Sequence, residues 1–385
     1  MEAKKHTPLM RMPAMQTLLA SLLCILLGLL VGFVALIIIN PGTNPETGLL
    51  YAFEAIVTVI KNFFNYSRPA SQLKYLGTTL VKTAPLVMCS LSVLFAYKVG
   101  LFNIGAAGQY VMGAGASLYC ALALHQPWYV CLLAAVAAGA LLGALSGVLK
   151  AYRNVNEVIS CIMLNWISLY GVNSLLSPVK DPASPYTLAL SKEAKQALLP
   201  TMGLNTLFTN NKNVTIAIPL AILMAVVVWV LLTKTRLGYE LRATGLNRNA
   251  ARYCGMKERQ NIILTMAIAG GLAGMGAAML YLSGFEEWSC TQASLPAMGF
   301  NGIAAAFLGG LHPIGAVFSA FFIQHITIGG SFVDKTMYCS QISDFISAVI
   351  IYMCGFVLFF KQSMNNRLDR RAERAARLTK GGEAA

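Results

Sequence analysis

Long apolar runs separated by short polar segments dominate the chain. Ten runs are candidate membrane spans: residues 18–39, 76–97, 102–124, 128–149, 158–176, 214–232, 262–283, 297–312, 314–330 and 340–360. A helix needs about 17–25 mostly apolar residues to cross a bilayer. A membrane barrel would instead alternate polar and apolar residues in segments of about ten. The pattern therefore predicts an all-α, polytopic membrane helix bundle with about ten transmembrane helices.

The least regular part of this pattern is residues 297–330. The sequence LGGLHPIGA interrupts it, and Pro313 ends a helix because proline has no N–H to donate. Two short helices and a re-entrant hairpin both fit this interruption. The first run, by contrast, is longer than the core of a signal peptide, so we predict a retained first helix.

The composition agrees with a membrane location. Of 385 residues, 57% are hydrophobic and 11% are charged, whereas a soluble domain carries about 25% charged residues. The net charge of +14 comes largely from three basic clusters, around Lys4–Arg11, Lys234–Arg259 and Lys361–Lys380. Even numbers of predicted spans separate these clusters, so the positive-inside rule predicts that all three, and both termini, are cytoplasmic. The charge then requires no nucleic acid as a partner.

The predicted topology divides the chain into three parts. Residues 1–75 contain the first helix and an outer amphipathic segment, YAFEAIVTVIKNFFNY, which we expect along the membrane interface. Residues 76–360 form the transmembrane core with a basic cytoplasmic loop at 233–260, and residues 361–385 form a basic cytoplasmic tail. Residues 177–213 are a second outer loop, for which a binding surface and a solvated linker are equally good interpretations.

The sequence offers little for catalysis. It contains no GxxxxGK[ST], HExxH, GxSxG or CxxC motif and no carboxylates paired at catalytic spacing. Ion-coupled carriers usually place acids or histidine inside their spans. Only His325 lies deep in a predicted span, and we expect it to hydrogen-bond across helices. Cys290 and Cys339 both fall outside in this topology, and whether they form a disulfide is left open.

Two glycine-rich segments combine small residues with amides. Lys98–Ser117 reads KVGLFNIGAAGQYVMGAGAS, and Leu295–Ala316 reads LPAMGFNGIAAAFLGGLHPIGA. Glycine allows close helix packing, but interrupted helices with exposed polar groups also mark binding sites in transporters. The loop 233–260 mixes small and charged residues, which favours one or two short helices that dock a partner.

Four motifs resemble those of a known family. GLFNIGAAGQ at Gly100–Gln109 is similar to the family's GLFNIGAEGQ, and NEVISCIMLNWI at Asn156–Ile167 is similar to its NEVISTIMLNWI. GLNRNAARYCGM at Gly245–Met256 resembles its cytoplasmic coupling segment, and FNGIAAAFLGGLHPIGA at Phe300–Ala316 resembles a fourth block. Over roughly residues 75–360 the chain therefore resembles the inner-membrane permeases of ABC importers for nucleosides and simple sugars, within the group that includes branched-chain amino acid permeases.

The resemblance implies an assembly. Such permeases work in pairs, here expected with a second, different permease chain, above ABC ATP-binding subunits and with an extracytoplasmic substrate-binding protein. The chain itself is expected to bind no cofactor, to have no ATPase site and to leave ATP and Mg to the partner subunits. The implied function is nucleoside import by a multi-pass protein of the inner (plasma) membrane. Simple sugars or riboflavin-like molecules are the alternative substrates, and an ion-coupled secondary carrier is a further alternative.

Two sets of residues follow as expectations. The substrate pathway is expected to contain amides that bind ribose hydroxyls or base edges and aromatic rings that stack on a base. The amides are Asn103, Gln109, Asn165 and Asn301, and the aromatic residues are Phe102, Trp166 and Phe300. For coupling to the ATPase, the expected residues are Gly245, Asn247, Ala250, Ala251, Tyr253 and Gly255. Ala107 stands where the family motif has glutamate, so any substrate contact made by that glutamate is missing here.

Overall fold

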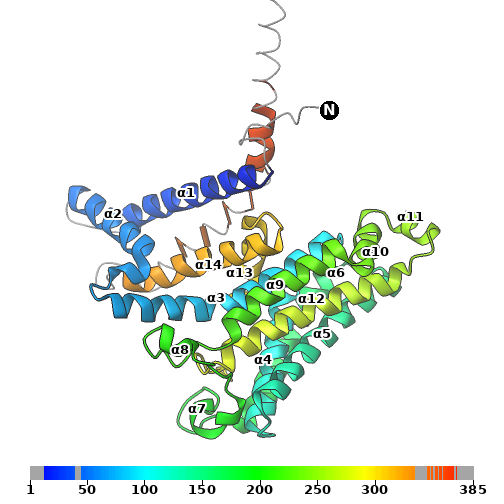
Figure 1. Ribbon diagram of the computed structural model, residues 1–385, viewed down its shortest axis with the longest axis horizontal. Helices are drawn as coiled ribbons and strands as arrows, with labels where there is room; N and C mark the ends of the chain where they lie inside the picture. Colours follow the sequence, from blue (N-terminus) through cyan, green and yellow to red (C-terminus); the bar gives the residue numbers. More distant parts are fainter. Residues whose placement is uncertain are drawn as a thin grey trace, which may run out of the picture.

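The protein is described by a computed structural model, which covers residues 13–39, 45–333, 345–346, 348–349, 352–353, 355–357, 359–367 and 370. Within these residues the regular structure is helical, apart from isolated single-residue bridges. The α-helices of ten or more residues are α1 (Pro13–Ile39), α2 (Pro45–Lys61), α3 (Pro69–Lys98), α4 (Ala106–Leu122), α5 (Trp128–Arg153), α6 (Glu157–Leu176), α9 (Ala217–Lys234), α10 (Arg236–Leu246), α12 (Glu258–Tyr281), α13 (Ala297–Leu308) and α14 (Pro313–Gly329). Figure 1 shows their arrangement.

Seven of the described helices are long and apolar enough to cross a membrane: α1, α3, α5, α6, α9, α12 and α14. Each coincides with a predicted span, so the predicted helical membrane bundle is confirmed at this level. The predicted span 340–360 and Cys339 lie partly or wholly outside the described residues. Whether Cys290 and Cys339 form a disulfide therefore stays an open question.

One predicted span starts in the wrong place. We expected a helix from residue 102, but α4 begins at Ala106. The chain turns sharply at Gly100, whose φ is +76°, a conformation that glycine adopts without steric cost. The segment Val99–Gly105 is thus a break between α3 and α4.

The predicted interruption at 297–330 separates two helices. Gly309–His312 connect α13 to α14, and the two helices pack against each other. With 12 residues, α13 is only about 18 Å long, too short to span the roughly 30 Å hydrocarbon core alone. It is enclosed instead by α3, α4 and α14.

Two helices form the centre of the bundle. In the most apolar stretches of α3 and α12, 89% and 78% of residues are buried, against 28% in α1, α5 and α9. α12 packs along α5, α3 and α4. The peripheral helices turn large apolar side chains outward, as expected for surfaces in contact with lipid.

Glycines allow α5 and α12 to pack backbone against backbone. A methyl group at Gly270 would collide with the carbonyl of Gly139, and one at Gly143 would collide with the carbonyl of Met266. A methyl group at Gly113 of α4 would likewise collide with the backbone of Gly274 in α12. Lipid is as apolar as a leucine side chain, so helices in a membrane associate through such close contacts rather than through the hydrophobic effect.

The basic loop 233–260 and the loop 177–213 lie at opposite ends of α12. The basic loop leads into its first residue, whereas Leu282, just after its last, accepts a 2.9 Å hydrogen bond from the N–H of Leu199 in the loop 177–213. This outer loop is folded. Thr187 N–H donates to Trp288 O at 2.9 Å, and the buried Trp288 indole donates to Asn173 Oδ1 at 3.0 Å.

Most of the amphipathic segment YAFEAIVTVIKNFFNY lies in α2, and His325 joins the end of this helix to α14. His325 Nδ1 lies 3.2 Å from Asn62 Nδ2, and His325 Nε2 lies 2.8 Å from the carbonyl oxygen of Ile60. The expectation that His325 hydrogen-bonds across helices is confirmed.

We predict that Gly270→Ala destabilises the bundle by about 1–3 kcal/mol, because α5 and α12 must move apart to accommodate the methyl group. Thermal unfolding of the purified protein measures the effect. Gly171→Ala is the matched control, since no heavy atom lies within 4 Å of the added methyl group. Equal unfolding temperatures for the two variants would contradict the close packing of α5 and α12.

Candidate functional site

The break between α3 and α4 places polar groups inside the bundle. Gly100 N–H donates to Tyr97 O and Leu101 N–H to Ala96 O, both at 3.0 Å, which closes the end of α3. The following residues then run without helical structure to Ala106. Asn103 lies in this segment and is completely buried.

Two of the predicted pathway residues bind each other. Asn103 Nδ2 donates to Gln109 Oε1 at 2.8 Å and to Ser92 Oγ at 3.0 Å, and Gln109 Nε2 donates back to Asn103 Oδ1 at 3.1 Å. A buried amide without partners is costly, and this reciprocal pair satisfies both amides. In this conformation neither amide is accessible to a substrate.

Asn165 attaches α6 to the same break. Its Oδ1 accepts the N–H of Gly108 at 2.8 Å, and its Nδ2 donates to the carbonyl of Ile104 at 3.2 Å. Gly108 is required here, because a methyl group at this position would lie 2.7 Å from the Cα of Asn165. Residues from α3, α4, α6 and the break thus form one polar cluster: Ser92, Asn103, Gln109 and Asn165, called here the amide cluster.

Within the described residues, the remaining pathway residues make no hydrogen bond with the amide cluster. Phe102 and Asn301 are partly buried, and Phe300 is 37% exposed. Trp166 is 40% exposed and stacks on Tyr170, with 6.1 Å between ring centroids. The structure therefore brings the three predicted amides of α4, α6 and the break together, but it does not gather the three aromatic rings around them.

The two glycine-rich motifs meet at Ala107. A methyl group at Gly299, next to Phe300, would lie 2.6 Å from the backbone nitrogen of Ala107, which is itself buried. The start of α13 thus packs directly against the first turn of α4, backbone to backbone. The alanine that replaces the family's glutamate lies at this contact.

The basic loop forms two short helices, α10 and α11 (Arg248–Tyr253), which confirms the prediction of one or two. Thr235 Oγ1 accepts the N–H of Gly238 at 3.1 Å, and Asn247 Oδ1 accepts the N–H of Ala250 at 3.1 Å. Each side chain satisfies an N–H in the first turn of its helix, which is the role of an N-cap. Gly255, with φ +79°, ends the segment.

This helix pair presents large side chains to solvent. Tyr253 is 93% exposed and Leu246 is 89% exposed, whereas Ala251 is buried against the bundle. Gly245, Asn247 and Ala250 are exposed as well. Tyrosine is enriched among the residues that carry binding energy at interfaces, so Tyr253, with Leu246 exposed on the same helix pair, is a candidate contact for a partner. The sequence analysis did not identify Leu246, because nothing in its sequence neighbours distinguishes an exposed leucine from a core leucine.

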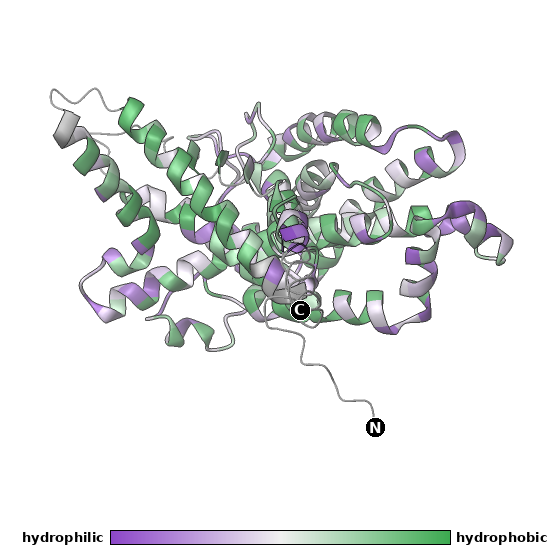
Figure 2. Cartoon of the chain, turned by 90° about the horizontal axis from the view of Figure 1, so that it is seen from above, coloured by the Kyte–Doolittle hydropathy of each residue, from purple (hydrophilic) through white to green (hydrophobic). Residues whose placement is uncertain are grey.

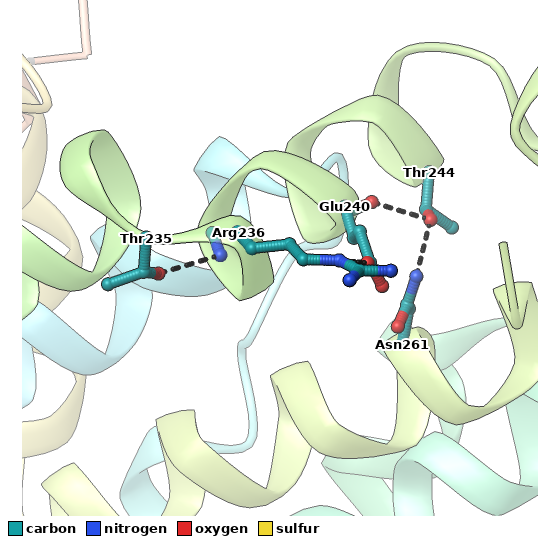
Figure 3. A network of polar contacts seen from close by, with 6 residues as sticks. Thr235, Arg236, Glu240, Thr244 and Asn261 are labelled. Atoms are coloured by element: carbon teal, nitrogen blue, oxygen red, sulfur yellow. Dashed lines mark hydrogen bonds and ion pairs between the residues drawn. The ribbon is translucent and has the colours of Figure 1, made fainter.

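A polar network ties α10 to the central helix α12 (Figure 3). Asn261 Nδ2 donates to Thr244 Oγ1 at 2.8 Å in a buried contact, and Thr244 Oγ1 donates to the carbonyl of Glu240 at 2.8 Å. On the exposed side, Arg236 Nε lies 2.9 Å from Glu240 Oε1. Because the Thr244–Asn261 bond is buried, α10 is expected to move together with the start of α12.

The same end of α10 touches the break. A methyl group at Gly100 would lie 2.8 Å from the carbonyl oxygen of Gly245, and one at Gly245 would collide with the carbonyl of Val99. The two backbones are thus in direct contact. No flexible side chain separates the end of α10 from the start of the segment that carries Asn103.

Comparison with known proteins identifies the family. Residues 75–354 match the family model described as branched-chain amino acid transport system / permease component. The chain belongs to this family. It is a permease subunit of an ABC transporter and a multi-pass protein of the plasma membrane. No solved structure matches it significantly.

Several curated relatives are ABC transporter permeases. The guanosine permease protein NupP of Bacillus subtilis is 34% identical over 87% of this chain and 92% of its own length. The nucleoside permease protein NupB of Lactococcus lactis is 30% identical over 87% of this chain and 89% of its own. A glucose permease protein of Haloferax volcanii is 28% identical over 94% of this chain and 93% of its own length.

We predict that Asn103→Ala destabilises the protein by about 2 kcal/mol, because it leaves the buried amide of Gln109 without its partner. The shift in the thermal unfolding midpoint measures the loss. Asn301→Ala is the matched control, since Asn301 occupies the equivalent place in the second motif and is only partly buried. If both variants unfold at the same temperature, the amide pair does not stabilise the bundle.

Proposed function

We propose that the chain is the permease subunit of an ATP-driven importer for nucleosides. The observation that carries this proposal is the similarity to guanosine and nucleoside permeases over nearly the full length of both chains. Simple sugars are the second candidate, because a glucose permease is similar over an equally large part of the chain. Riboflavin-like molecules come after these.

The proposed complex contains two permease chains that are different from each other, ABC ATP-binding subunits and an extracytoplasmic binding protein. This chain is proposed to cross the membrane about ten times, with α13 and the non-helical residues beside it making one of the crossings, so that both termini lie in the cytoplasm. The partners bind and hydrolyse ATP with Mg. The placement of α10–α11 and of the loop 177–213 at opposite ends of α12 supports this topology, because it puts the basic loop and the outer loop on different sides.

In this proposal, movement driven by ATP hydrolysis is transmitted from the helix pair α10–α11 to the break between α3 and α4. In this proposal the exposed Leu246 and Tyr253 contact the ATP-binding subunit, and the Asn261–Thr244 bond makes α10 move with α12. The contact between Gly245 and Gly100 then displaces the segment that carries Asn103. Closure of the ATP-binding subunits is thereby converted into a rearrangement of the amide cluster.

The amide cluster is closed in the present structure, and we propose that it opens during alternating access. Once separated, the amides of Asn103, Gln109 and Asn165 offer donors and acceptors to ribose hydroxyls or base edges. Phe102, Phe300 and Trp166 then provide faces for stacking on a base, worth about 1–3 kcal/mol per base in nucleic-acid complexes.

The decisive experiment uses the purified complex. We expect ATP hydrolysis to rise when nucleosides are added together with the binding protein. If an ATPase co-purifies but its rate of ATP hydrolysis does not change with nucleosides, the substrate is instead a sugar or a flavin. Uptake that survives without any ATP-binding partner but collapses with the proton gradient would establish an ion-coupled carrier instead.

We predict that Gly245→Ala uncouples the transporter. The added methyl group forces α10 away from Val99, so the nucleoside imported per ATP hydrolysed falls by about tenfold, the scale of a coupling free energy of about 1–3 kcal/mol. Uptake and ATPase activity of the same reconstituted complex provide this ratio. Gly171→Ala, whose methyl group meets no neighbour, is expected to keep the wild-type ratio. An unchanged ratio in Gly245→Ala would exclude this coupling contact.

A further inference from the structure

A basic pocket lies beside the helix pair α10–α11 and is not part of the route described above. It has a volume of about 350 Å³ and is lined by Tyr152, Arg252, Met256, Lys257, Glu258, Arg259 and Gln260. Three elements contribute to it: the last turn of α5, the end of α11 with the turn that follows, and the first turn of α12. Figure 2 shows hydrophilic segments gathered at this end of the molecule, on the right.

The charges of the pocket favour an anion. The cationic groups of Arg252, Lys257 and Arg259 line it, against the single carboxylate of Glu258. In the first turn of α12 the N–H of Glu258 donates to Met256 O and that of Asn261 to Lys257 O, both at 3.0 Å. The N–H groups of Arg259 and Gln260 remain, together with the positive end of the helix dipole. Cationic side chains and helix N-termini together are the ordinary protein partners of a phosphate group.

The aromatic ring orders one of these cations. The guanidinium carbon of Arg259 lies 5.2 Å from the centroid of the Tyr152 ring. Such a cation–π contact limits the positions of a long, otherwise flexible side chain. It also spans from α5 to α12, so the pocket is built on two membrane-spanning helices rather than on a loop alone.

The position of the pocket identifies the source of the phosphate. Tyr152 is one residue from the end of the span Trp128–Arg153, and Arg259 is the second residue of the span Glu258–Tyr281. Groups at the ends of spans lie at the level of the lipid headgroups. A basic pocket between helices at that level is suited to an anionic lipid headgroup.

We propose that this pocket binds the phosphate of an anionic phospholipid through Arg252, Lys257 and Arg259. The lipid joins the start of α12 to the end of α5, and its acyl chains extend along the outward faces of those helices. The proposal goes beyond the importer function and requires only that the chain resides in a membrane.

The test compares two triple variants of the full chain that remove the same charge. Arg252→Gln, Lys257→Gln and Arg259→Gln neutralise the pocket, whereas Lys180→Gln, Lys192→Gln and Lys195→Gln neutralise exposed lysines of the outer loop. Each protein is placed in nanodiscs of phosphatidylcholine mixed with phosphatidylglycerol, and native mass spectrometry counts the phosphatidylglycerol retained. We expect the pocket variant to bind it about a hundredfold more weakly, because each cation near an anionic headgroup contributes about fivefold. The control variant should match the wild type.

Three outcomes would overturn the proposal. Equal retention by the two variants would show that the pocket does not select the lipid. Protection from thermal unfolding by inorganic phosphate in pure phosphatidylcholine, without selective retention of phosphatidylglycerol, would point to a soluble phosphate compound. Loss of the co-purifying ATPase with unchanged lipid retention would make the pocket a protein-docking surface. Since lipid retention is measured without nucleoside or ATP, failure here is distinguishable from failure of the nucleoside proposal.

Discussion

Backbone-to-backbone packing of α12 is the contact on which the rest of the bundle depends. In lipid, burying an apolar face gains little, so helices associate where small residues bring main chains together and dispersion contacts accumulate. The glycines of α5, α4 and α12 provide such a surface where α5 and α4 contact α12. The same device recurs where Gly100 meets Gly245 and where Gly299 meets Ala107, which are the points that connect the functional segments. Packing and the proposed coupling therefore rely on one kind of contact.

Polar groups supply the specificity that close packing lacks. The amide cluster fixes how α3, α4 and α6 meet, the Thr244–Asn261 bond fixes α10 on α12, and Trp288 fixes the outer loop on Asn173. Each of these bonds is buried or partly buried, where a missing partner is expensive. Together they mark three levels along the bundle: the outer loop, the break and the helix pair on the basic side.

Much of the fold follows from the sequence, because a membrane span must be a continuous apolar helix. The seven long helices and the helical nature of the basic loop were predictable for this reason. The start of α4 was not, since Leu101 and Phe102 are as apolar as the helix that follows, and hydropathy does not reveal the turn at Gly100 after α3. The candidate site was predictable in its residues but not in its partners. Nothing local indicates that Asn103 and Gln109 would bind each other, or that Trp166 would face away from Asn165, because tertiary packing decides both.

The composition of the amide cluster has an electrical consequence. Ser92, Asn103, Gln109 and Asn165 are all neutral and have no ionisable group, so rearranging them moves no net charge through the bilayer. A membrane potential performs work of about 2.3 kcal/mol per elementary charge per 100 mV, and on this cluster it performs almost none. Voltage and proton concentration therefore do not act directly on the cluster itself. The cluster can respond only to mechanical displacement of the backbone that holds it, which arrives from the ends of the helices.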